Sequence, residues 1–162
     1  MMMDLRNQDL RNTDYTQTDT SGWIFAHANI ELCKFHNCVG TNFVGACGAA
    51  IFTGADITGA TFEKADESVL ASLVGAIWNV QTITRVSGWL TQAGYWCFAT
   101  DQFVQCGCLQ KTFAEWDRIC STPDSIQELN QGITEPALLV DTEFAFKWWQ
   151  QYRTTILNWI NG

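Results

Sequence analysis

The chain has 162 residues, of which 47% are hydrophobic and 16% are charged, and its formal net charge is −8. This composition supplies enough apolar side chains for a packed core and excludes a disordered chain. The acidic balance argues against direct binding of DNA or RNA, which needs a basic surface, and favours docking to a basic partner or simple solubility.

Residues 1–67 are organised by a period of five. From Met3 the chain reads MDLRN, QDLRN, TDYTQ, TDTSG, WIFAH, ANIEL and CKFHN, and the third residue of six of these seven units is large and apolar. The register slips at Cys38–Gly40, which we interpret as three added residues, and again at Ala46–Ala49, where one residue is missing. The period returns in AIFTG, ADITG and ATFEK and ends near Glu67.

A period of five fits neither a helix nor a strand. It fits a chain that turns a corner every five residues, with one large and one small side chain pointing inward and three facing water. These units, above all ADITG and ATFEK, resemble the pentapeptide-repeat proteins. The resemblance implies a mostly β fold, a short right-handed quadrilateral β-helix of about three coils, followed by a small α+β domain over residues 68–162. Strand-like stacking makes this rod only about 15 Å long.

The outward second positions of the repeat carry acidic residues. One aspartate on each side of a four-sided coil forms a belt and not a cleft, so the belt is either a solvated surface, which we favour, or a binding surface. Residues 1–67 hold nine acids and four bases, a net charge of −5, against roughly nine charges on a comparable length of DNA. The candidate acidic binding residues are Asp4, Asp9, Asp14, Asp19, Asp56 and Asp66.

The first coil raises the question of how its end is covered, because bare ends of stacked repeats promote aggregation. Either Met1–Met3 fold over this end or a second copy of the chain stacks on it. The second alternative predicts a homodimer formed through the N-terminal coil.

Residues 68–162 contain seven of the eight tryptophans. Residues 68–78 indicate a short helix or an apolar cap, and residues 82–86 alternate as in a strand. Residues 95–99 and 102–106 indicate a β-hairpin turning at Thr100-Asp101. Helices are predicted over 112–119, from Pro123, and from Pro136 to about Ile160.

This half resembles the C-terminal module of phage and prophage pentapeptide-repeat proteins. The matching features are Gly107-Cys108, Glu115-Trp116 and the run from Trp148 to Tyr152, WWQQY. The family commonly has a histidine three residues after the cysteine, where this chain has Lys111. The departure weakens a metal or acid–base role for the motif, and the resemblance implies a phage origin more than a mechanism.

No motif in the sequence supports catalysis, and we expect no catalytic residue, cofactor or metal. The seven cysteines include no pair with the usual zinc spacing, so we interpret them as buried thiols without a disulfide framework. His27 and His36 fall on outward positions. We expect the tryptophans to pack mainly as core; the alternative is a pocket or an exposed patch that holds a ligand or a partner. The adjacent Trp148 and Trp149 cannot share one side of a helix, so one of them is the candidate for such a patch.

These features together favour a non-enzymatic, phage-encoded protein-binding protein. It would inhibit or regulate a host protein of unknown identity in the host cytoplasm, through DNA-mimic-like or counter-defence action. A structural or virion-assembly role is the alternative, and capture of a small molecule by the aromatic residues is a third. The N-terminus lacks the pattern of a signal peptide and no apolar run is long enough to span a bilayer, so we expect no membrane association.

Overall fold

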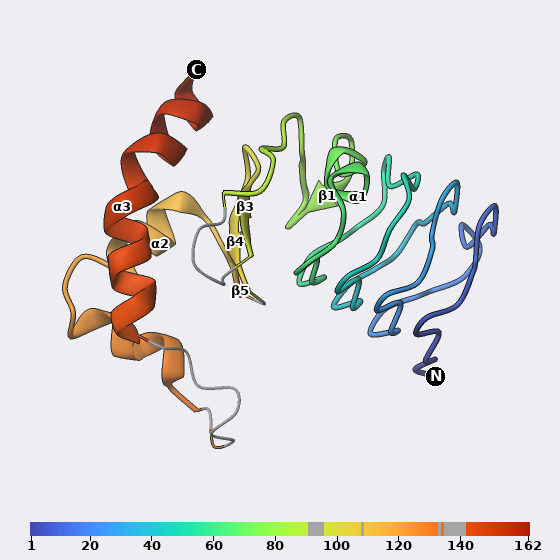
Figure 1. Ribbon diagram of the computed structural model, residues 1–162, viewed down its shortest axis with the longest axis horizontal. Helices are drawn as coiled ribbons and strands as arrows, with labels where there is room; N and C mark the ends of the chain where they lie inside the picture. Colours follow the sequence, from blue (N-terminus) through green and yellow to red (C-terminus); the bar gives the residue numbers. More distant parts are fainter. Residues whose placement is uncertain (91–95, 108, 133, 135–141) are drawn as a thin grey trace. The chain divides into compact units, whose positions relative to one another are not determined.

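A computed structural model describes residues 1–90, 96–107, 109–132, 134 and 142–162 (Figure 1). The chain divides into two compact units, Met1–Gln110 and Lys111–Gly162. The domain boundary predicted after residue 67 falls inside the first unit, because the residues that follow continue the packing of its core.

The first unit begins with a stack of coils joined by isolated parallel β-bridges, seen from blue to green in Figure 1. Asp4 bridges Ile24 and Asp9 bridges Asn29, each pair 20 residues apart, whereas Lys34 bridges Ile51 only 17 residues away. The shorter spacing follows from the two register slips. A right-handed quadrilateral β-helix stays a prediction that this bridge pattern supports.

The first register slip differs from its sequence interpretation. Asn37 bridges both Asp19 and Asp56, so it occupies the outward second position of a unit formed by residues 36–40. Cys38 therefore stands at the large inward position and is fully buried. The truncated unit is Cys33–Phe35, and Cys38–Gly40 are not an insertion.

A tight turn follows most units and explains the choice of residue at the fifth position. The first residue of the next unit donates its N–H to the carbonyl of the central residue, as from Ala55 to Phe52 at 2.8 Å. The fifth residue then has a positive φ, such as +74° at Gly54, which is the geometry of a type II turn. Leu32 adopts φ +59° at the same position, where most side chains are strained.

A ladder of aromatic rings fills the coils. Phe43 stacks on Phe25 and Phe62, with both centroid distances 5.3 Å, and meets Phe35 and Phe52 edge-on, also at 5.3 Å. All five side chains are almost completely buried. Burial of so many rings supplies the main stabilisation of this unit.

Short elements close the last coil. These are α1 (Glu67–Ala71), the paired strands β1 (Ile77–Trp78) and β2 (Gln81–Thr82), and a three-stranded sheet ordered β3 (Cys97–Ala99), β4 (Val104–Cys106) and β5 (Leu109–Lys111). The predicted hairpin is confirmed by antiparallel β3 and β4; Tyr95 lies outside the described residues. Phe98 on β3 meets Phe62 of the last coil with a centroid distance of 6.3 Å.

Gln110 joins the last coil to these elements. Its side-chain oxygen accepts from Gly59 N at 2.9 Å and from the Trp78 indole at 2.8 Å, and its amide donates to the Ala60 carbonyl. One amide thereby satisfies backbone and indole groups that would otherwise lack partners.

The second unit is helical. α2 (Phe113–Ile119) begins with a capping box between Thr112 and Glu115, and the 3₁₀ helix η1 (Ser125–Asn130) and α3 (Thr142–Asn161) pack with it. The predicted start of the last helix at Pro136 lies outside the described residues. Among the parts of the chain that the structure describes, no helix has both the length and the apolar character to cross a membrane.

Candidate functional site

The four aspartates of the first coil begin four separate columns of stacked residues. Asp4 leads to Ile24 and Asn42, Asp9 to Asn29 and Cys47, Asp14 to Lys34 and Ile51, and Asp19 to Asn37 and Asp56. The structure therefore does not gather the aspartates into one cleft.

Three of these four carboxylates have a cationic partner. Asp4 pairs with Arg6 at 2.5 Å and Asp9 with Arg11 at 2.6 Å, while Lys34 approaches Asp14 at 3.4 Å. Hydrogen bonds from the Arg6 and Arg11 side chains lower the pKa of Asp4 and Asp9, so both remain ionised and paired at neutral pH. Pairing leaves most of the first coil with little net charge.

The fourth aspartate belongs to a different surface. Asp19 accepts from Ser21 N and from the Asn37 side-chain amide, both at 3.0 Å, and Asp56 accepts from Thr58 N at 3.0 Å and its hydroxyl at 2.7 Å. Hydrogen bonds from Ser21 lower the pKa of Asp19. These hydrogen-bond partners are neutral, and no ion pair among the described residues neutralises Asp19 or Asp56, although the positively charged N-terminus also lowers the pKa of Asp19 through space. We call the stack Asp19, Asn37 and Asp56 the acidic column.

A shallow polar groove borders the acidic column. Its volume is about 330 Å³, and hydroxyl, amide, imidazole and carboxylate groups line it; they belong to Thr16, Gln17, Thr18, Asp19, His36 and Asn37. Such a groove offers several hydrogen-bonding groups beside a carboxylate. It suits a polar or basic side chain of a partner.

Asp66 has a structural role. Its carboxylate accepts from Val69 N at 3.0 Å and Ser68 Oγ at 2.6 Å and so caps α1, and it also accepts from Gly48 N at 3.1 Å. Burial raises the pKa of Asp66, but these hydrogen bonds lower it by more, and the net shift is downward. The carboxylate of this predicted binding residue is therefore engaged in hydrogen bonds inside the fold.

Trp148 and Trp149 are both buried, with 3% and 0% of their surfaces exposed, so core packing holds for this pair and the alternative of an exposed aromatic patch is wrong. Trp149 stacks on Trp116 and donates its indole N–H to Asp117 at 3.4 Å. Adjacent tryptophans on one helix are both covered because α2 contributes an aromatic layer of its own. Among the described residues, the Trp148 indole N–H and the Tyr152 hydroxyl have no hydrogen-bond partner.

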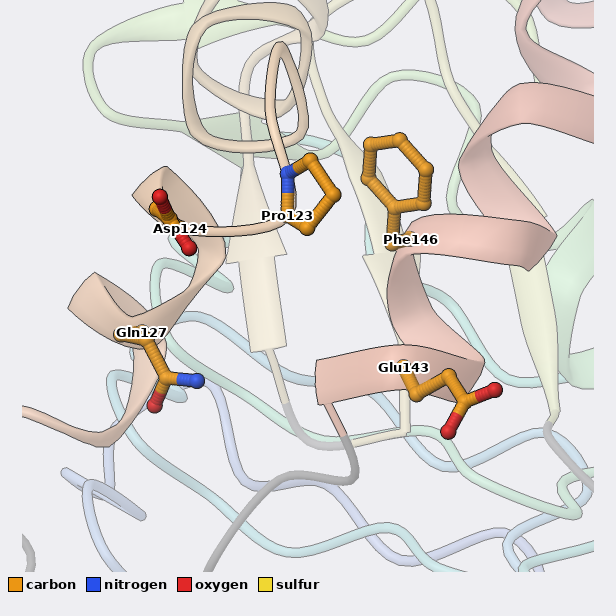
Figure 2. A pocket seen from close by; sticks show the side chains of 5 residues that line it. All are labelled: Pro123, Asp124, Gln127, Glu143 and Phe146. Carbon is orange, nitrogen blue, oxygen red and sulfur yellow. The ribbon is translucent and has the colours of Figure 1, made fainter.

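The half-buried ring of Phe146 lines a hollow in this unit. Phe146 and Pro123 line this hollow of about 260 Å³ together with Asp124, Gln127 and Glu143. Figure 2 shows these five side chains. Glu143 pairs with Lys147 at 2.5 Å, whereas no side-chain hydrogen bond caps η1 from Asp124. An aromatic ring beside carboxylates is an arrangement that can receive a cationic side chain.

Sequence reasoning missed His36, Asn37 and Phe146. The signal for Asn37 was present in the repeat, but the misplaced register slip put it outside the aspartate positions. His36 was recognised as an outward residue but not as a neighbour of Asp19. Phe146 carries no motif that separates it from the other apolar residues of α3.

The six described cysteines form no disulfide, and the described residues hold no group of three or more candidate metal ligands. Cys33 and Cys38 are buried inside the coils as predicted. No protein-family model and no curated protein matches the chain.

Proposed function

We propose that the chain is a non-enzymatic protein-binding protein whose acidic column docks a basic surface of its partner. The observation that carries this proposal is the uneven compensation of charge. Asp4, Asp9 and Asp14 lie in ion pairs with cationic side chains, whereas the described hydrogen bonds to Asp19 and Asp56 come only from neutral groups. Uncompensated charge on one side attracts and orients a partner of opposite charge.

The proposed fold is a short pentapeptide-repeat β-helix, and the proposed setting is a phage protein that acts on a host protein in the host cytoplasm. The parallel bridges and type II turns support the fold, and the resemblance of the second half to phage proteins supports the setting. The inhibitory form of the proposal is DNA-mimic-like. Internal ion pairs reduce the charge available for mimicry, so a mimic would present the acidic column and not the whole belt.

A matched pair of double variants tests the acidic column. Asp19→Asn with Asp56→Asn removes two uncompensated charges, whereas Asp4→Asn with Asp9→Asn removes two paired ones. The probe is host gyrase in a supercoiling assay, together with capture of host proteins on the immobilised protein. We expect the wild type and the second variant to inhibit and capture, and the first variant to lose at least tenfold in potency. Equal potency of both variants, or no inhibition and no capture by the wild type at micromolar protein, contradicts the proposal.

The alternative is an assembly role in which copies stack end to end, starting with a homodimer through the N-terminal coil. In later coils a residue such as Lys34 uses both its N–H and its C=O to bond to the preceding coil, through Thr13 O and Tyr15 N. In the first coil, the corresponding N–H and C=O groups of Asp4, Asp9 and Asp14 have no partner among the described residues. The side chains of Met1–Met3 are exposed, although the Met1 carbonyl accepts from the Trp23 indole at 3.0 Å. Such an edge is a template for another chain.

The dependence on ionic strength distinguishes docking to a basic partner from stacking of copies. Binding of the acidic column to a basic partner weakens as ionic strength rises. Stacking through the first coil rests on backbone hydrogen bonds between coils whose aspartates are mostly paired with cations, so salt should change it little. Sedimentation of the purified protein at low and high salt measures the second effect. A monomer under both conditions at high protein concentration rejects the homodimer.

A further inference from the structure

The strands β3 and β4 bring two cysteines together. Cys97 pairs with Cys106 across the antiparallel strands. A hydrogen bond joins Gly107 N to Trp96 O at 3.1 Å, one residue pair away from the cysteines. Another joins Thr100 N to Phe103 O at 2.8 Å, three pairs away at the turn. Since hydrogen-bonded pairs alternate with non-hydrogen-bonded ones, Cys97 and Cys106 form a non-hydrogen-bonded pair, in which side chains approach most closely.

The two sulfur atoms lie 2.8 Å apart. A disulfide has a bond length of about 2.05 Å, and it tolerates the Cα separation of about 4.5–5.5 Å that antiparallel pairs provide. Bond formation therefore requires a movement of less than about 1 Å, within what side-chain rotation supplies. Two other described cysteines have partners of a different kind: Cys33 donates to the Leu10 carbonyl at 3.0 Å, and Cys38 contacts the Thr20 hydroxyl at 3.4 Å.

We propose that Cys97 and Cys106 are a modification site at which a peroxide-class oxidant closes a cross-strand disulfide. Cys106, which is 6% exposed, is reached first, whereas Cys97 is fully buried. The Cys106 sulfur, as thiolate, attacks one peroxide oxygen, the O–O bond breaks, and the departing hydroxide takes up the thiol proton as water. The Cys97 sulfur then attacks the resulting sulfenic acid, the S–S bond forms, and the S–O bond breaks to release a second water. Two thiols lose two electrons, and the peroxide is reduced to two waters.

Burial controls how fast this site reacts. Burial, reinforced by the neighbouring Cys106 thiol, raises the pKa of the Cys97 thiol, so Cys97 is protonated at neutral pH. Reaction is therefore slower than at an exposed thiolate and accelerates at alkaline pH. The product ties β3 to β4, and Phe98 on β3 and Phe103 next to β4 both belong to the core of the first unit. Oxidation thus fixes the hairpin that closes the last coil.

The experiment treats the intact protein with hydrogen peroxide, alkylates the remaining thiols in denaturant and measures the mass. We expect the loss of two alkylatable thiols and of two hydrogen atoms, both restored by dithiothreitol. Chymotryptic cleavage after Phe103 leaves two peptides joined only through the disulfide, which locates the bond in the wild type without any substitution.

Variants assign the bond. Cys97→Ser and Cys106→Ser should each abolish the linked peptides, whereas Cys47→Ser, at an exposed cysteine, should leave them unchanged. Cys108→Ser, at a position outside the described residues, should also retain them and so excludes a bond to Cys108. Absence of linked peptides in the oxidised wild type, or their persistence in Cys97→Ser, overturns the proposal.

Discussion

Replacement of Phe43 by alanine tests the aromatic ladder that holds the coils together. The ring is fully buried and has four aromatic neighbours, all with centroids 5.3 Å away. Deleting a buried phenylalanine side chain costs about 3–5 kcal/mol, and each aromatic pair adds about 0.5–1.5 kcal/mol beyond burial when isolated. Because the cavity would lie between two stacked rings, we expect a loss near the upper end, about 4–5 kcal/mol.

Two companion variants calibrate this value. Phe43→Leu keeps most of the volume and should cost about 1.5 kcal/mol or less. Tyr15→Ala removes a ring at the end of the ladder, where Tyr15 is half-buried and touches Trp23, Phe25 and Phe35; its cost should be about 2 kcal/mol. Urea titration followed by tryptophan fluorescence measures the unfolding free energy of all three variants. The comparison is valid where the slopes of free energy against urea concentration (the m-values) are similar. A loss for Phe43→Ala no larger than that for Tyr15→Ala refutes the continuous ladder.

Three further changes probe the turns, the cap of α1 and the closure of the last coil. Gly54→Ala should lower the free energy of unfolding by about 1 kcal/mol, because alanine is strained at this positive φ; no atom lies within 4 Å of the added Cβ, so a steric clash adds nothing. The control Gly88→Ala, at a position without a positive φ, should change the stability in urea little. Asp66→Ala removes the cap of α1 and should lower the free energy of unfolding by about 1 kcal/mol at neutral pH. Because folding lowers the pKa of the Asp66 carboxyl from 3.8, the stability difference between wild type and variant is full above pH 3.8 and shrinks as an acid titration goes below it. Gln110→Leu leaves the Trp78 indole N–H without its acceptor and should lower the urea midpoint by the equivalent of about 2 kcal/mol; an unchanged midpoint would show that water replaces the amide.

The ion pairs of the first coil could have been predicted and were not. In the unit Asp-Leu-Arg, the arginine follows the aspartate by two residues, and both flank an inward-pointing leucine. Both side chains therefore leave the same side of the coil and meet. Counting net charge over residues 1–67 hid this local neutralisation, and with it the contrast between Asp4 and Asp19.

The sequence by itself determined the inward positions of the repeat outside the register slips and the β3–β4 hairpin, because each depends on residues that are close along the chain. Only the tertiary structure decided which residues stack above one another, since two shortened units, Cys33–Phe35 and Ala46–Ala49, shift the columns that follow them. It also decided that Trp148 and Trp149 are both buried and that Cys97 faces Cys106, because strand register and packing between helices fix those contacts. The acidic column belongs to this second group: its residues are separated by 18 and 19 positions, and only the winding of the chain brings them together.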